Sequence, residues 1–160
     1  MAFAAILESG AVVTWGKPED GGDSSQVQEQ LRNVQHIQAT NRAFAAILAS
    51  GAVVTWGDPQ HGGDSSQVQE QLRNVQHIQA TAYAFAAILE SGAVVTWGHP
   101  AFGGDSSHVQ EQLKNVQHIQ TTDYAFAAIL ESGAALTWGQ PKYGGDSGQV
   151  QEQLSLGATT

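Results

Sequence analysis

The chain has no cysteine, which excludes disulfide bonds, thiolate metal ligands and cysteine nucleophiles. Cations are scarce as well, since 6 Lys and Arg stand against 15 Asp and Glu and leave a formal net charge of −9. An acidic chain repels nucleic-acid phosphates and anionic lipid surfaces, so neither nucleic acid nor membrane is expected as a partner. The sequence also lacks an apolar run of membrane-spanning length and the basic start of a signal peptide. The compartment is therefore undetermined, with the cytoplasm as the default.

What the sequence does have is repetition. The stretch AFAAILESGAVVTWG is written four times with few changes, and the copies begin at Ala2, Ala43, Ala84 and Ala125. The copies follow one another every 41 residues, a period that is typical of solenoids, propellers and repeat arrays. We expect a single repeat domain over residues 1–160 with the units 2–42, 43–83, 84–124 and 125–160. Such a chain can also be a fragment of a longer array.

Each unit carries three strand patterns, as the second copy illustrates. Val34 to Ala39 alternates between two faces, whereas Ala43 to Leu48 and Ala52 to Trp56 are apolar on both faces or nearly so. The Ala-Ser-Gly between the last two patterns predicts a hairpin in which Gly51 takes a positive φ. Strands that are apolar on both faces are buried on both faces, and in a tandem array the neighbouring copies supply that cover.

A short helix is expected after each hairpin. The loop x-Pro-x-x-Gly-Gly comes first, and Asp64 with its two serines then has the residue types that cap the start of a helix. Val68, Leu72 and Val75 follow at the spacing of one helical face. The residues predicted as helix caps are Asp23, Asp64, Asp105 and Asp146.

The predicted fold class is mostly β with short helices, as four blade-like repeats in a small propeller-like ring. The alternative is an open repeat array that is closed by dimerisation. Leu154 to Thr160 reads as a shortened copy of the alternating strand, and the ring closes in one chain if this tail pairs beside the first hairpin. If it does not, a second chain must cover that sheet edge, which predicts a homodimer through an open edge.

The segment Gly10 to Gly16, with Ala-Ile-Leu-Glu-Ser before it, resembles the repeat of the regulator of chromosome condensation family. That family has an alanine-rich strand, a turn ending in Gly and a second strand closing on Trp-Gly. Val75 to Ala80 looks like the family's inner strand. The resemblance implies a β-propeller fold and a surface for recognition, and it assigns no activity to a residue. The departures are a shorter unit and Gly-Gly-Asp-Ser in place of Gly-x-Leu-Gly.

The repeated large and titratable side chains are weighed against structural roles. A Trp at the end of an apolar strand is expected to pack in the core between copies, and these residues are Trp15, Trp56, Trp97 and Trp138. Weak metal candidates are the histidines that recur in three copies, His36, His77 and His118, which a ring would bring around its axis. Their strands carry no carboxylate and no second His, so neither a metal nor a cofactor is expected.

The copies differ from one another mainly in two loops. One is the Pro-containing loop after Trp-Gly, and the other joins the alternating strand to the hairpin. A rigid scaffold presents binding residues on such loops, and exposed aromatic and Arg side chains are typical anchors of interfaces. The candidate binding residues are Phe102, Tyr143, Tyr83, Tyr124, His61 and Arg42.

The resulting hypothesis is a non-enzymatic binding or scaffold module whose variable loops recognise a protein or a glycan. One alternative is a structural or designed repeat protein with no ligand, because the copies are nearly identical. A less favoured alternative is an enzyme that uses the repeated Asp and His in a central pocket. The enzyme requires these Asp and His to meet in one cleft, whereas the binding module requires the loop aromatics to gather on one face.

Overall fold

The computed structural model describes residues 1–156, without the side chains of residues 155 and 156. It shows a mostly β chain of separate antiparallel sheets. The first sheet pairs β1 (Ala2–Ile6) with β2 (Val12–Gly16). The other sheets hold three strands each, in the orders β3-β4-β5, β6-β7-β8 and β11-β10-β9. Their bounds are β3 Val34–Ala39, β4 Ala43–Leu48, β5 Val53–Gly57, β6 Val75–Ala80, β7 Ala84–Leu89, β8 Val94–Gly98, β9 Val116–Thr121, β10 Ala125–Leu130 and β11 Ala135–Gly139.

Helical structure is confined to short segments. The 3-10 helices are η1 Pro18–Asp20, η2 Pro59–His61, η3 Gln69–Gln71, η4 Pro100–Phe102, η5 Gln110–Gln112 and η6 Pro141–Tyr143, and the α-helix is α1 Gln151–Leu156. The prediction of a mostly β fold of blade-like repeats with short helices is confirmed. Within residues 1–156, no helix is long and apolar enough to cross a membrane.

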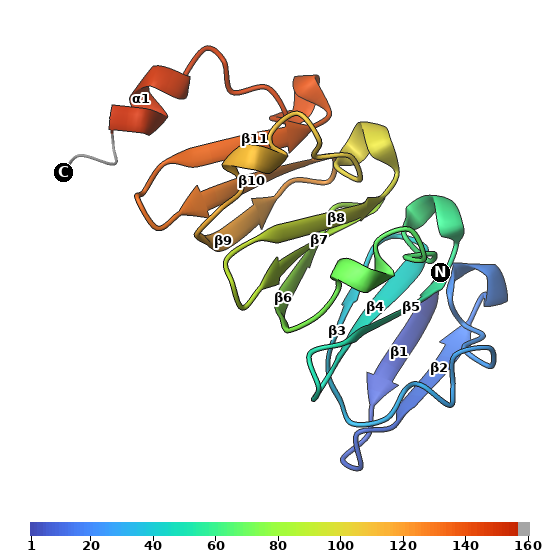
Figure 1. Ribbon diagram of the computed structural model, residues 1–160. Coiled ribbons are helices and arrows are strands. Elements are labelled where there is room, and N and C mark those ends of the chain that lie inside the picture. The colour runs from blue at the N-terminus through green and yellow to red at the C-terminus, as the bar shows by residue number, and fades with distance from the viewer. Residues whose placement is uncertain (157–160) are drawn as a thin grey trace.

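The sheets lie side by side in a curved row, with β1 and β2 at one end and β9 to β11 at the other (Figure 1). No sheet pairing joins the two ends within residues 1–156, so the row is open. Leu154 to Leu156, the start of the predicted closing strand, belong to α1 beside β11, and residues 157–160 lie outside the described residues. β1 therefore has a partner strand on one side only, whereas β4, β7 and β10 each lie between two strands.

The hairpin turn joins each sheet to the next. In the second unit Gly51 has a φ of +83°, as the sequence predicts, and its carbonyl accepts a hydrogen bond from the Val75 N–H at 3.0 Å. A Cβ at this glycine would lie 2.9 Å from the Asn74 backbone. The turn therefore needs glycine for its conformation and also for its close approach to the chain entering β6.

The helix predicted after Asp64 does not form as an α-helix, and the segment is a series of turns with one 3-10 turn at η3. The Gln69 side chain accepts from the Ser65 hydroxyl at 2.9 Å and donates to the Val53 carbonyl at 3.1 Å. These side-chain bonds tie the segment to strand β5, and the fourth unit makes the same bonds although its segment forms α1 from Gln151. Leu72 still reaches the core, but Val75 belongs to β6.

The aspartates predicted as helix caps consequently cap turns. In each unit the carboxylate accepts from the backbone N–H two residues later, at 2.9 Å. The pairs are Asp23 with Ser25, Asp64 with Ser66, Asp105 with Ser107 and Asp146 with Gly148. This is the local bond that short polar side chains form at turns, and it needs no α-helix behind it.

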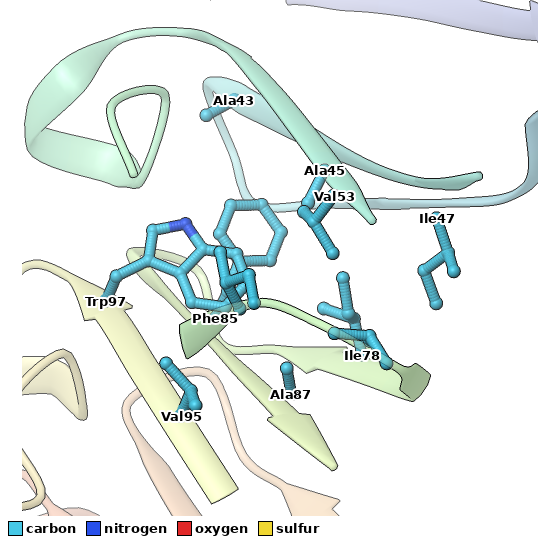
Figure 2. Close-up of a cluster of buried hydrophobic side chains, with 11 residues drawn as sticks. Ala43, Ala45, Ile47, Val53, Ile78, Phe85, Ala87, Val95 and Trp97 are labelled. Atoms are coloured by element: carbon cyan, nitrogen blue, oxygen red, sulfur yellow. The ribbon is translucent and has the colours of Figure 1, made fainter. Parts of the chain in front are cut away.

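The hydrophobic core lies between neighbouring sheets. Figure 2 shows Phe85 and Trp97 of the third unit opposite Ala43, Ala45 and Val53 of the second. The same positions form a cluster between the first and second units and another between the third and fourth. The two inner sheets are thus covered on both faces by their neighbours, which is why their central strands β4 and β7 are apolar on both faces.

Every buried Trp is anchored to a glycine of the preceding unit. The indole N–H groups of Trp56, Trp97 and Trp138 donate to the carbonyls of Gly21, Gly62 and Gly103, each at 3.1 Å. The three tryptophans are between 0% and 5% exposed, and each stacks on the Phe opposite it in the hairpin. The bond satisfies the one polar group of a buried indole.

Trp15 differs from the prediction that all tryptophans are core residues. It stacks on Phe3 at 5.4 Å like its counterparts, but it is 50% exposed. The physical reason is that within residues 1–156 no glycine-bearing loop packs over the first sheet. The burial of a Trp depends on the neighbouring unit and not on its own hairpin.

We expect Trp97→Ala to lower the free energy of unfolding by about 3–5 kcal/mol, because it leaves a cavity between two sheets. Gln76→Ala, which removes an exposed side chain of β6, is the control and should cost clearly less. Urea denaturation followed by circular dichroism measures both. Equal losses for the two variants would contradict the assignment of the core to the space between the sheets.

A second prediction separates backbone strain from packing at the glycine. Gly62 and Gly144 both have positive φ, at 95° and 102°, so alanine costs about 1–2 kcal/mol at either position. A Cβ at Gly62 would lie 2.6 Å from the Phe85 ring, whereas one at Gly144 meets nothing within 4 Å. Gly62→Ala should therefore be more destabilising than Gly144→Ala, by about 1–3 kcal/mol of overpacking. The same denaturation assay is carried out on chains that also carry Trp15→Glu, so that no second copy can cover Gly144. Indistinguishable variants would show that the close contact with Phe85 is unimportant.

Candidate binding surface

Two sets of loops meet at one edge of the sheets. The Pro loops are residues 17–21, 58–62, 99–103 and 140–144, which contain η1, η2, η4 and η6. The inner loops are residues 40–42, 81–83 and 122–124, which join β3 to β4, β6 to β7 and β9 to β10. These are the two loops in which the copies differ, so the variable side chains of the sequence lie at this edge.

The Pro loops have a fixed backbone. Pro59 is at the start of η2, where its φ suits a helical turn and its missing N–H is not needed. Asp58 accepts from the Gln60 N–H at 2.9 Å, and Gly62 ends the turn in the left-handed conformation. The residue just before this glycine is thereby held in place, and it is one of the variable positions: Asp20, His61, Phe102 or Tyr143.

Threonine hydroxyls tie the inner loops to the Pro loops. Thr40 donates to the carbonyl of His61 at 2.9 Å, Thr81 to that of Phe102 at 3.1 Å and Thr122 to that of Tyr143 at 3.1 Å. Each bond is accepted by a backbone oxygen, so it can form with any side chain at that position of the Pro loop. The prediction from sequence missed these threonines, although their recurrence with the repeat period is a signal that could have found them.

The candidate aromatic residues gather into one row. Ring centroids are 4.9 Å apart for His61 and Tyr83, 4.6 Å for Tyr83 and Phe102, 5.5 Å for Phe102 and Tyr124, and 4.7 Å for Tyr124 and Tyr143. Inner-loop and Pro-loop residues alternate, so the row crosses from the second unit to the fourth. We call these five residues the aromatic row. Such contacts contribute about 0.5–1.5 kcal/mol per pair beyond their buried area.

Four rings of the row, those of His61, Tyr83, Phe102 and Tyr124, are half-buried. Tyr143 at the end of the row is 54% exposed. His99 lies alongside, 4.8 Å from Phe102 and 6.2 Å from Tyr83. The surface is therefore a fixed strip of ring edges and faces, held by threonine bonds and by stacking.

The row continues as charged pairs towards the N-terminal end. Arg42 occupies the place of Tyr83 one unit earlier and lies between two carboxylates, 3.6 Å from Asp20 and 3.5 Å from Asp58. His61 lies 3.3 Å from Asp58, and the Met1 ammonium group donates to Asp20 at 2.7 Å. This hydrogen bond, together with the positive charges of the ammonium group and Arg42, lowers the pKa of the nearly buried Asp20. Arg42 is thus placed beside the aromatic row with its charge already paired.

The repeated Asp and His required by the enzyme alternative do not meet. Asp23 and Asp64 line a groove of ≈ 820 Å³ between the first and second units, whose lining contains serines but no His. His36 and His77 border a separate hollow of ≈ 130 Å³ next to β3 and β6. His118 is exposed like the other two, and the described residues include no group of three or more His, Cys, Asp or Glu arranged to hold a metal ion.

Asp20 gives a pH-dependent prediction. Because its pKa is lower in the folded chain than its ordinary value of 3.8, ionised Asp20 stabilises the fold above that value, and the contribution disappears as the pH falls through the lowered one. Asp20→Asn should therefore be less stable than the parent at neutral pH, and the difference should shrink in acid. Urea denaturation at several pH values measures it, with the exposed Glu29→Gln as control. A difference that is constant with pH would refute the ion pair's role.

No protein-family model and no curated protein matches the chain. Among solved structures, yeast RCC1 (Prp20) in a complex with Kap60 aligns at 14% identity and a TM-score of 0.64, over 89% of this chain and 42% of that one. Human WBSCR16 aligns at 17% identity and a TM-score of 0.55, over 86% and 45%. The CRINKLY ectodomain of the Arabidopsis thaliana receptor kinase ACR4 aligns at 17% identity and a TM-score of 0.52, over 87% and 47%. The chain spans less than half the length of each of these chains, and its fold is RCC1-like.

Proposed function

We propose that the chain is a non-enzymatic binding module that uses the aromatic row to hold a protein partner. The observation that carries the proposal is the gathering of variable loop residues in a single strip, although they come from five different loops of three units. These residues are His61, Tyr83, Phe102, Tyr124 and Tyr143. Loops whose sequences change without any effect on function would not be expected to place aromatic side chains in contact along a single strip.

The rigidity of the strip supports recognition. Tyrosine offers a large contact area with few rotatable bonds, and rings that already stack on one another lose little conformational freedom on binding. The threonine bonds from Thr81 and Thr122 fix the backbone under Phe102 and Tyr143 in advance. An interface of this kind binds through its aromatic anchors, with the polar groups at its border adding specificity.

The charge of the chain indicates the chemistry of the partner. With a net charge of −9, the chain attracts a positively charged segment from solution. Arg and Lys side chains also bind to the faces of Tyr and Phe rings, so the aromatic row suits a basic, partly apolar peptide segment. RCC1-like structures offer a precedent for protein binding, since Prp20 is reported with Kap60 and as binding Gsp1p and histones.

A peptide selection tests the proposal. A random peptide library displayed on phage is selected on the immobilised chain, and the affinities of the selected peptides are measured by titration calorimetry. We expect basic peptides whose affinity falls about tenfold or more in Tyr83→Ser/Tyr124→Ser, as for the loss of interface anchors. A glycan array probed with the same chain tests whether the aromatic row binds a glycan in place of a peptide.

The control is His36→Ser, which changes an exposed ring on the inner strand, outside the aromatic row. This variant should bind the selected peptides as well as the parent does. Peptides that bind equally to the parent and the double Tyr variant would refute the proposal, as would binding to glycans with no peptide selected.

A further inference from the structure

The two ends of the row of sheets carry the two halves of the contact that joins neighbouring sheets. At each internal contact one sheet presents Phe, Ala, Trp and a Val or Leu, which we call its front face, to the rear face of the preceding sheet. Between the second and third units the front face is Phe85, Ala87, Val95 and Trp97, and the rear face is Ala43, Ala45, Ile47 and Val53 (Figure 2). The Pro loop of the preceding unit completes the rear face with its glycine.

The front face of the first sheet is uncovered within the described residues. It consists of Phe3, Ala5, Val13 and Trp15, and Phe3, Val13 and Trp15 are 63%, 46% and 50% exposed. The stack of Phe3 on Trp15 already has the geometry of the internal pairs, at 5.4 Å against 5.2–5.3 Å. Within residues 1–156, the Trp15 indole N–H has no acceptor, whereas its three counterparts each donate to a glycine carbonyl.

The matching rear face at the other end is only partly covered, since Ala127 and Ile129 are partly exposed while Ala125 and Ala135 are buried. Gly144 has the left-handed conformation of Gly21, Gly62 and Gly103, with a φ of 102°. A Cβ at those three glycines would lie 2.4–2.6 Å from a Phe ring of the next unit, whereas one at Gly144 meets nothing within 4 Å. Ala127 on the rear face is likewise partly exposed, although its counterparts Ala45 and Ala86 are fully buried.

We propose that a second copy of this chain covers these faces, so that the first sheet of one copy packs on the last sheet of the other. The three internal contacts define the occupant, because each is formed by the same positions of the repeat. The front face of the fourth unit has Leu136 in place of Val, and its rear face has Ala135 in place of Val. Trp15 of one copy then donates to the Gly144 carbonyl of the other, and Phe3 fills the space beside that glycine. This contact uses the faces of the sheets, and it is independent of the aromatic row.

The contact joins two different patches, one from each end of the chain. Contacts of this kind form closed rings when the rotation between copies allows it. Two copies together have eight sheets, within the usual range of 4–8 blades in β-propellers. A head-to-tail dimer therefore gives both exposed apolar faces the cover that all the internal faces have.

Sedimentation equilibrium of the 160-residue chain over a series of concentrations tests the contact. The expected result is a mass twice the 16.8 kDa of one chain. Trp15→Glu places a charge on the front face, and Gly144→Asn fills the space on the rear face with a residue that tolerates positive φ. Each variant alone should sediment as a monomer, with an unchanged circular dichroism spectrum. Gln67→Glu, which adds the same charge at an exposed position on neither face, should keep the parent's mass.

Mixing the two variants distinguishes this contact from any symmetric one. A Trp15→Glu chain keeps an intact rear face and a Gly144→Asn chain keeps an intact front face, so the mixture should regain the dimer that neither variant forms alone. A monomeric parent chain, a variant that stays dimeric, or a mixture that stays monomeric would each overturn the proposal. Tyr83→Ser/Tyr124→Ser should leave the mass unchanged, so this proposal and the peptide-binding proposal fail or succeed separately.

Discussion

The structure depends on one contact, in which a glycine of the Pro loop of one unit accepts the indole N–H of the next unit and lies against its Phe ring. Only glycine meets both demands at this point, because the φ is positive and a Cβ would overlap the ring, as at Gly62 against Phe85. The contact fixes the distance and the angle between successive sheets. It also buries the largest side chains of the molecule, so the same atoms set the geometry and supply much of the hydrophobic stabilisation.

Because each sheet is completed by its neighbour, stability is shared between units and is lowest at the ends of the row. Repeat proteins of this kind are stabilised by the sum of their units and of the contacts between them. The exposed Phe3 and Trp15 show how much apolar surface a unit carries when one contact is uncovered. A monomer seldom leaves such a patch open to water, and this constraint links the fold to association.

The sequence allowed the strands, the hairpins and the burial of Trp56, Trp97 and Trp138 to be predicted, because the apolar pattern and the Gly turn are local signals. It could not predict that Trp15 is exposed, since that depends on what packs against the hairpin and not on the hairpin itself. The short helix expected after Asp64 is reduced to the 3-10 turn η3, whereas the corresponding segment of the fourth unit forms α1, a difference that periodicity does not reveal. The candidate loop residues were identified from the differences between copies. Their alternation in one strip depends on each inner loop lying beside a Pro loop 21 residues further along the chain, where a threonine bond joins the two.

The threonine bonds have an evolutionary consequence. Since Thr40, Thr81 and Thr122 each hold a backbone carbonyl, the side chains above them can be exchanged without altering the frame that carries them. Each unit contributes its own rings to the strip, so shuffling, duplicating or deleting whole units by recombination changes the order of the rings while the contacts between units keep the same form. Gene rearrangement alone can thus diversify the side chains that the strip presents.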